Sequence, residues 1–120
     1  MIVVLWILNI LLAVIFLGVG GMKVLRSRDA LAARFMPWAA DFAPTTVRLI
    51  GVAEVLGGLG LVLPLLTGIA PLLAPIAAIG LTLAMIVAGA VHVRRHETPA
   101  PAVVAGILTI ASAVIGFITL

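Results

Sequence analysis

The chain has 120 residues, of which 65% are hydrophobic and 9% are charged, and its mean hydropathy is +1.44. Soluble domains average about 25% charged residues, so this composition cannot supply a water-facing surface, and the bilayer is the expected solvent. The formal net charge is +3, and the sequence contains no cysteine, which excludes disulfides, thiol chemistry and thiolate metal sites.

Four apolar runs are long enough to cross a membrane, which takes about 20 residues as a helix. They are Ile2 to Met22, Thr46 to Leu63, Pro71 to Val93 and Pro101 to Leu120. They use most of the chain and leave no room for a soluble catalytic domain. Because the links after the second and third runs are short, neighbouring helices must be antiparallel. We therefore predict a single all-α domain over residues 1–120, an integral membrane four-helix up-down bundle.

The first run differs from a secretory signal peptide in two ways. No Lys or Arg precedes it, and it is longer than the apolar region of about 7–15 residues that such signals carry. We expect it to be retained as the first membrane helix.

The longest connection, residues 23–44, is expected to be more than a tether. Its large apolar residues recur at helical spacing between charged residues: Leu31, Phe35, Trp38 and Phe42. This pattern is typical of an amphipathic helix lying in the membrane interface. Pro37 is expected to break or kink that helix.

The basic residues all fall in or beside the first and third connections. They are Lys23, Arg26, Arg28, Arg34, Arg48, Arg94 and Arg95. The positive-inside rule makes that end cytoplasmic and places both termini on the non-cytoplasmic side. The net charge is thus a topology signal, and we expect no nucleic-acid partner. Basic residues at the surface also attract anionic membrane lipids, by about 1 kcal/mol each.

Glu54 is the one acidic residue inside a predicted span, near the middle of the second. An acidic residue at the centre of a membrane helix costs about 2.5–3.5 kcal/mol, so Glu54 is expected to face the bundle interior and to have a partner. Gly51, Gly57 and Gly58 share its face of the helix. Glycines there let a neighbouring helix approach closely, which predicts a helix-packing role for them.

Two other spans carry comparable faces. On the third span, His92 shares a face with small residues that include Gly89, which is also predicted to pack helices. On the first span, Lys23 shares a face with Gly20 and, deeper in the membrane, with Asn9.

If these faces meet, Lys23, Glu54, His92 and Asn9 converge in the cytoplasmic half of the bundle as a polar ligand-binding site. Arg48 lies about 120° around the helix from Glu54 and about 9 Å nearer the cytoplasm, and is a second-choice partner. Three alternatives stay open. Glu54 pairs with Lys23 or Arg48 and sets helix register, or the group binds a polar head group or relays a proton through the histidine, or Glu54 is protonated and alone.

No other pattern indicates catalysis. One histidine and one glutamate in the membrane do not make a metal site. The glycines of residues 57–60 lie in mid-helix, whereas a phosphate-binding loop lies between a strand and a helix. We expect no catalytic residue and no cofactor held by this chain alone, and favour a subunit or binder over an independent enzyme.

Three segments together resemble the DoxX-like family of small four-helix bacterial membrane proteins. They are GVGGMK with Gly18, Gly21 and Lys23, RLIGVAEVLGGLGLVLP with Arg48, Gly51, Glu54, Gly57, Gly58 and Pro64, and GLTLAMIVAGAVHVRRHE with Met85, Gly89, Ala90 and His92. The resemblance spans nearly the whole chain. It implies a multi-pass protein of the bacterial cytoplasmic (inner) membrane, with Lys23, Glu54 and His92 as signature residues.

The family takes its name from a subunit of a sulfur-compound:quinone oxidoreductase, and other members resemble partners of redox or stress-defence proteins. The resemblance therefore implies a non-catalytic membrane subunit or anchor of a redox system, with quinone or lipid as the ligand at Glu54 and an oxidoreductase subunit or a second copy as partner. The alternative is a membrane scaffold, assembly or lipid-binding protein without a redox role. A small-solute carrier ranks last, because the chain lacks symmetric, interrupted half-helices.

Overall fold

Four long helices make up most of the chain in the computed structural model, which describes residues 1–120. They are α1 (Ile2–Leu25), α3 (Pro44–Thr67), α4 (Leu73–Arg94) and α5 (Ala100–Thr119). Each is long and apolar enough to cross a membrane. Their outward side chains are large and apolar, for example Ile7, Ile86 and Ile107. This confirms the prediction of an all-α membrane bundle.

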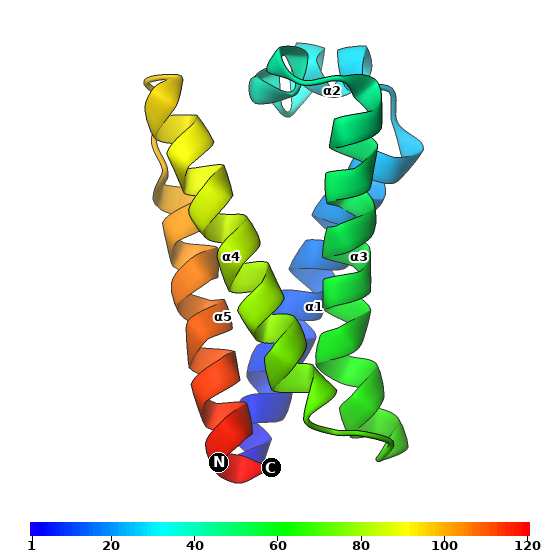
Figure 1. Cartoon of the computed structure of the whole chain (residues 1–120), viewed down its shortest axis with the longest axis vertical. Helices are drawn as coiled ribbons and strands as arrows, with labels where there is room; N and C mark the ends of the chain where they lie inside the picture. The colour runs from blue at the N-terminus through cyan, green and yellow to red at the C-terminus, as the bar shows by residue number, and fades with distance from the viewer.

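The bundle has up-down topology, with both termini at one end and α2 (Arg28–Arg34) at the other (Figure 1). α1 packs most extensively on α3, and α4 on α5; α3 also packs on α4, and α1 on α5. The four helices therefore form a closed ring made of two tight pairs.

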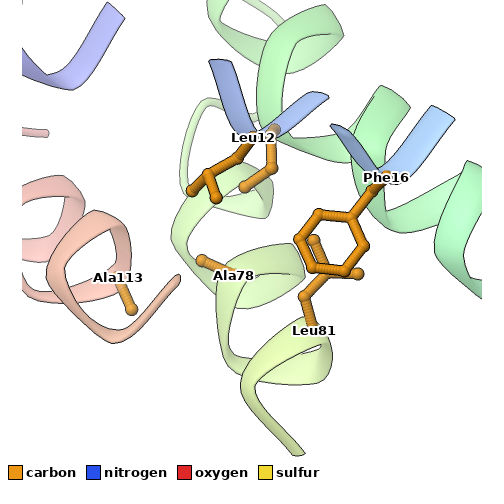
Figure 2. Packing of buried hydrophobic residues seen from close by; sticks show 6 residues of the cluster. Leu12, Phe16, Ala78, Leu81 and Ala113 are labelled. Atoms are coloured by element: carbon orange, nitrogen blue, oxygen red, sulfur yellow. The ribbon is translucent and has the colours of Figure 1, made fainter. Parts of the chain in front are cut away.

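The apolar core lies in the half of the bundle nearer the termini. There Leu12 and Phe16 of α1 meet Ala78 and Leu81 of α4 and Ala113 of α5 (Figure 2), together with Leu61 of α3. Towards the other end, the α1–α3 pair and the α4–α5 pair diverge (Figure 1). The core thus joins the two pairs at one end and leaves them apart at the other.

Two of the helix ends that differ from the sequence prediction lie beside prolines. α3 does not stop before Pro64 but continues to Thr67, because an internal proline removes only one backbone hydrogen bond, and the rest of the last turn stays paired. Gly68 ends the helix in the left-handed conformation, with φ of 70°, which glycine adopts without steric cost. α4 begins at Leu73, so Pro75 and not Pro71 occupies its first turn, where no hydrogen bond is lost.

The connection from α1 to α3 contains two short helices, α2 and the 3₁₀ helix η1 (Pro37–Asp41). Ser27 caps α2 by accepting a hydrogen bond from the Ala30 amide at 3.2 Å. The predicted break at Pro37 is confirmed, and the single interfacial helix becomes two. Leu31 and Ala39 pack against Val47 of α3, which holds this segment onto the α1–α3 pair.

Candidate functional site

α1 and α3 touch backbone to backbone at Gly20 and Gly51. A Cβ atom added to Gly51 would lie 2.6 Å from the Lys23 Cβ and 2.7 Å from the Gly20 carbonyl oxygen. Only glycine fits at this distance, so the crossing brings the next side chains on both helices, Lys23 and Glu54, face to face.

The Lys23 ammonium group donates a hydrogen bond to Oε1 of Glu54, forming an ion pair between α1 and α3. Both side chains are buried, with 8% of Lys23 and 3% of Glu54 exposed. The Lys23 ammonium also lies 5.2 Å from the ring centroid of Trp38 in η1, a favourable cation–π geometry. Phe42 packs edge-on against Trp38, with ring centroids 5.7 Å apart. The pair is therefore enclosed by the interfacial segment as well as by the two helices.

The ion pair lies in the wall of a cavity of about 630 Å³, in the half of the bundle where the helix pairs diverge. All four long helices line it, from Phe16 and Met85 near the core to Trp38 at the basic end. Fourteen of its 19 lining residues are hydrophobic. Ligand pockets of about 300–1,000 Å³ with mostly apolar walls and a few polar groups are typical of small-molecule sites.

His92 and Arg94 line the same cavity from the last turn of α4. His92 does not pair with Glu54, since its Nδ1 lies 3.4 Å from Oε1 of Glu97 in the link to α5. Arg94 is exposed and forms no ion pair. The site thus combines one compensated ion pair with an imidazole and a free guanidinium nearer the end of the bundle.

Arg48 does not join this site. It is exposed on the first turns of α3 and takes part in no ion pair. Its position about 120° from Glu54 around the helix points it away from α1, while Lys23 reaches the carboxylate directly. The ion-pair partner of Glu54 is therefore Lys23.

Asn9 does not converge with Lys23 and Glu54 either, which corrects the sequence-based expectation. It lies about 21 Å from Lys23 along α1, in the half of the bundle nearer the termini. Its Nδ2 donates to the Leu61 carbonyl at 2.8 Å, and its Oδ1 accepts from Ser112 Oγ. Sharing a helix face did not bring the two residues together, because they are 14 positions apart along the axis.

The glycines predicted to pack helices occupy different environments. Besides Gly51, Gly57 lies against Leu81 of α4 and Gly58 against Leu17 of α1, where an added Cβ would have neighbours at 2.5 and 3.2 Å. An added Cβ at Gly89 would find its nearest such neighbour, the Ala102 Cβ, at 4.0 Å. Gly89 therefore has room for a side chain that Gly51 and Gly57 lack.

Sequence reasoning missed the part of the cavity wall that comes from the connection between α1 and α3. Met36, Trp38 and Phe42 line it, although their pattern indicated only an interfacial helix. The aromatic pair just beyond Pro37 was the available signal. Arg94 was missed because its charge was explained by membrane topology alone.

No three histidine or acidic side chains lie together in a way that could hold a metal ion. The remaining buried polar contacts join helices. The hydroxyl oxygens of Thr82 in α4 and Thr109 in α5 lie 2.8 Å apart, and each lies within hydrogen-bonding distance of a backbone carbonyl of its own helix. Because each hydroxyl has one proton, one threonine donates to the other, and the second donates to the carbonyl of its own helix. Every polar group in this pair has a partner, so it adds to helix packing and not to the site.

These features define a class: a four-span membrane protein with a buried lysine–glutamate pair in the wall of an apolar cavity. The sequence model of the DoxX-like family matches residues 7–114, and the chain belongs to this family. The resemblance seen in the Lys23, Glu54 and His92 segments is thereby confirmed. Searches of curated proteins and of solved structures found no match to the chain.

Proposed function

We propose that this protein is a non-catalytic subunit or anchor of a redox system in the bacterial cytoplasmic membrane, and that its cavity binds a quinone. The observation that carries the proposal is the place of the Lys23–Glu54 pair. The pair lies in the wall of a cavity of about 630 Å³ and not within a filled helix interface. A cavity with apolar walls and one polar region suits a molecule with an apolar body and a polar head.

The ion pair has hydrogen-bonding capacity to spare for such a head group. An ammonium group has three donors, and a carboxylate has two acceptor oxygens. The pair uses one ammonium donor and Oε1 alone. Lys23 can therefore donate to a carbonyl oxygen of a quinone, and Glu54 can accept from a hydroxyl of the reduced form. Hydrogen bonds to charged groups in a water-poor site are stronger than those in water.

The walls of the cavity are also consistent with a ligand that arrives from the bilayer. Ile15 and Val87 line the cavity, and 39% and 63% of these two residues, respectively, are exposed. At this depth the surroundings are hydrocarbon, so an apolar molecule can reach the cavity sideways without crossing water.

A scaffold or lipid-binding protein without a redox role is the second candidate. The close contact of Gly20 with Gly51 beside the ion pair favours it, because buried pairs are known to fix the register of helices. Under this alternative the pair positions α1 on α3, and the cavity holds a membrane lipid.

Replacing both charges separates the two candidates. The double variant Lys23→Met, Glu54→Leu removes the ion pair without leaving a buried charge uncompensated, a change that proteins often tolerate. The variant and the native protein are purified from membranes in mild detergent, and mass spectrometry identifies the proteins and lipid-soluble molecules that co-elute. The proposal expects quinone and an oxidoreductase subunit with the native protein, and loss of the quinone from the folded variant.

The matched control removes a polar pair away from the cavity, by Thr82→Val with Thr109→Val. This control is expected to keep any bound quinone. Retention of quinone by the folded Lys23→Met, Glu54→Leu protein would contradict the proposed site. Native protein that elutes with phospholipid alone, and with no oxidoreductase, would favour the scaffold or lipid-binding alternative.

A further inference from the structure

The segment formed by α2 and η1, residues 28–42, covers the basic end of the cavity. It contributes Met36, Trp38 and Phe42 to the cavity wall. Its apolar contacts are made with one side of the bundle, through Leu31 and Ala39 on Val47 of α3. Figure 1 shows it beside α3, at the same end of the bundle as the link between α4 and α5. The segment is thus attached to the α1–α3 pair.

One ion pair joins this segment to the opposite side of the bundle. Asp41, at the end of η1, pairs with Arg95, the residue that follows α4. Arg95 also donates from Nε to Oε1 of Glu97 at 3.1 Å, and the same oxygen lies 3.4 Å from His92 Nδ1 in the cavity wall. Glu97 therefore holds the guanidinium group in place between the cavity wall and Asp41.

The Asp41–Arg95 ion pair is exposed enough to break and re-form. Asp41 is 52% exposed and Arg95 27% exposed, and ion pairs with such exposure are weak and are screened by salt. The hydrogen bond to Asp41 raises the pKa of Arg95 above its usual value, so Arg95 keeps its charge at any pH the protein meets. Salt can therefore weaken the contact while Arg95 stays charged.

We propose that residues 28–42 form a lid over the cavity and that the Asp41–Arg95 ion pair is its latch. The lid turns about its apolar contacts with α3, and release of the latch separates it from the α4–α5 link. Trp38 moves with the lid and loses its contact with Lys23 when the lid opens. This inference extends the proposed function, since it assigns control of access to the same cavity, but the lid itself does not depend on which molecule the cavity holds.

Tryptophan fluorescence reports on the lid directly. The chain has two tryptophans, and Trp6→Phe leaves Trp38 as the single emitter. This parent protein is reconstituted in phospholipid vesicles, and quenching by acrylamide measures the exposure of Trp38 to water. Acrylamide is uncharged, so a change of charge at residue 41 does not alter its local concentration. A short-chain benzoquinone also quenches tryptophan, so the loss of Trp38 fluorescence measures its binding. Excess empty vesicles are then added to take up the benzoquinone, and the recovery of fluorescence measures its release.

In the parent background, Asp41→Asn is expected to increase acrylamide quenching of Trp38. It is also expected to speed release of the benzoquinone by about two- to five-fold, the range that one exposed ion pair supports. High salt should bring the parent to the same values and leave the Asp41→Asn protein unchanged. Asp41→Glu keeps the charge and should behave as the parent. Asp29→Asn is the matched control, because Asp29 lies in the same segment but pairs only with its neighbour Arg28.

Equal acrylamide quenching in the parent and the Asp41→Asn protein, at low and at high salt, would overturn the lid. If the benzoquinone does not quench Trp38 in the parent but Asp41→Asn and salt still expose it, the lid is supported and the quinone proposal fails. If the benzoquinone binds and leaves at the same rate in both proteins, the quinone proposal stands and the latch is rejected.

Discussion

Gly51 shows how one missing side chain positions the ion pair. An added Cβ would meet the Lys23 Cβ at 2.6 Å and the Gly20 carbonyl at 2.7 Å, and neither can move without shifting α1. We expect Gly51→Ala to destabilise the protein by about 1–3 kcal/mol, as overpacking does. Gly18→Ala is the control, because an added Cβ there meets nothing within 4 Å, and alanine is favoured over glycine within a helix.

Thermal unfolding in detergent, followed by circular dichroism, measures both changes. The Gly51→Ala protein should unfold at a lower temperature than the native protein, and the Gly18→Ala protein at the same or a higher one. Equal unfolding temperatures for the two variants would show that α1 and α3 are not in close contact at Gly51.

Substitution of Glu54 alone is expected to destabilise the protein more than substitution of Glu54 and Lys23 together. Glu54→Gln alone leaves the Lys23 charge buried without its partner, which costs about 3–5 kcal/mol in buried pairs. Lys23→Met with Glu54→Leu removes both charges and should be more stable than the single variant. The same unfolding measurement compares the two. A single variant that is as stable as the double one would mean that Lys23 finds another partner or is not buried.

Among the elements, α1 is tied to its neighbours near the termini by a hydrogen-bond cluster that the sequence did not indicate. Asn9 links α1 to the Leu61 carbonyl of α3 and to Ser112 of α5. Asn9→Leu removes the acceptor of the Ser112 hydroxyl and the side-chain donor to the Leu61 carbonyl, whereas Thr82→Val leaves Thr109 its own backbone acceptor. Interhelical hydrogen bonds in membranes are worth about 0.6–2 kcal/mol.

We therefore expect Asn9→Leu to lower stability by about 1–2 kcal/mol and Thr82→Val by about half as much or less. Reversible unfolding in mixed micelles gives both values. The reverse order of the two losses would show that the Thr82–Thr109 contact, and not Asn9, is the stronger tie between helices.

The elements themselves were largely predictable, because a bilayer admits few alternatives to apolar helices. The four spans and the break at Pro37 follow from local sequence. The pairing of Glu54 with Lys23 was one of the alternatives that helix faces left open. The cavity was not predictable, because it is a volume left between helices that diverge, and no residue type marks such a volume. The Asp41–Arg95 contact joins residues 54 positions apart and has no local pattern.

At the scale of the whole molecule, one end carries nearly all of the charge. The seven basic side chains and the four acidic ones lie on the half of the bundle that holds the cavity, α2 and η1. The opposite end carries only the two chain termini and apolar or small polar residues. Basic residues retained on one side of the membrane set the orientation of helices during insertion. We therefore expect the cavity and its lid to open towards the cytoplasm and both termini to lie outside it.

Fusions of a reporter enzyme that is active only outside the cytoplasm test this orientation. A fusion after Leu120 should be active, and a fusion after Thr98, in the link between α4 and α5, should be inactive. A second reporter, active only in the cytoplasm, should give the opposite result at both sites. Changing Arg94 and Arg95 to Gln removes two of the seven basic residues. If the one-sided distribution of basic residues sets the orientation, this variant should insert in a mixture of both orientations. Cytoplasmic activity from the Leu120 fusion would reverse the assignment and place the lid on the outer face, where the Asp41–Arg95 latch would meet the salt of the exterior.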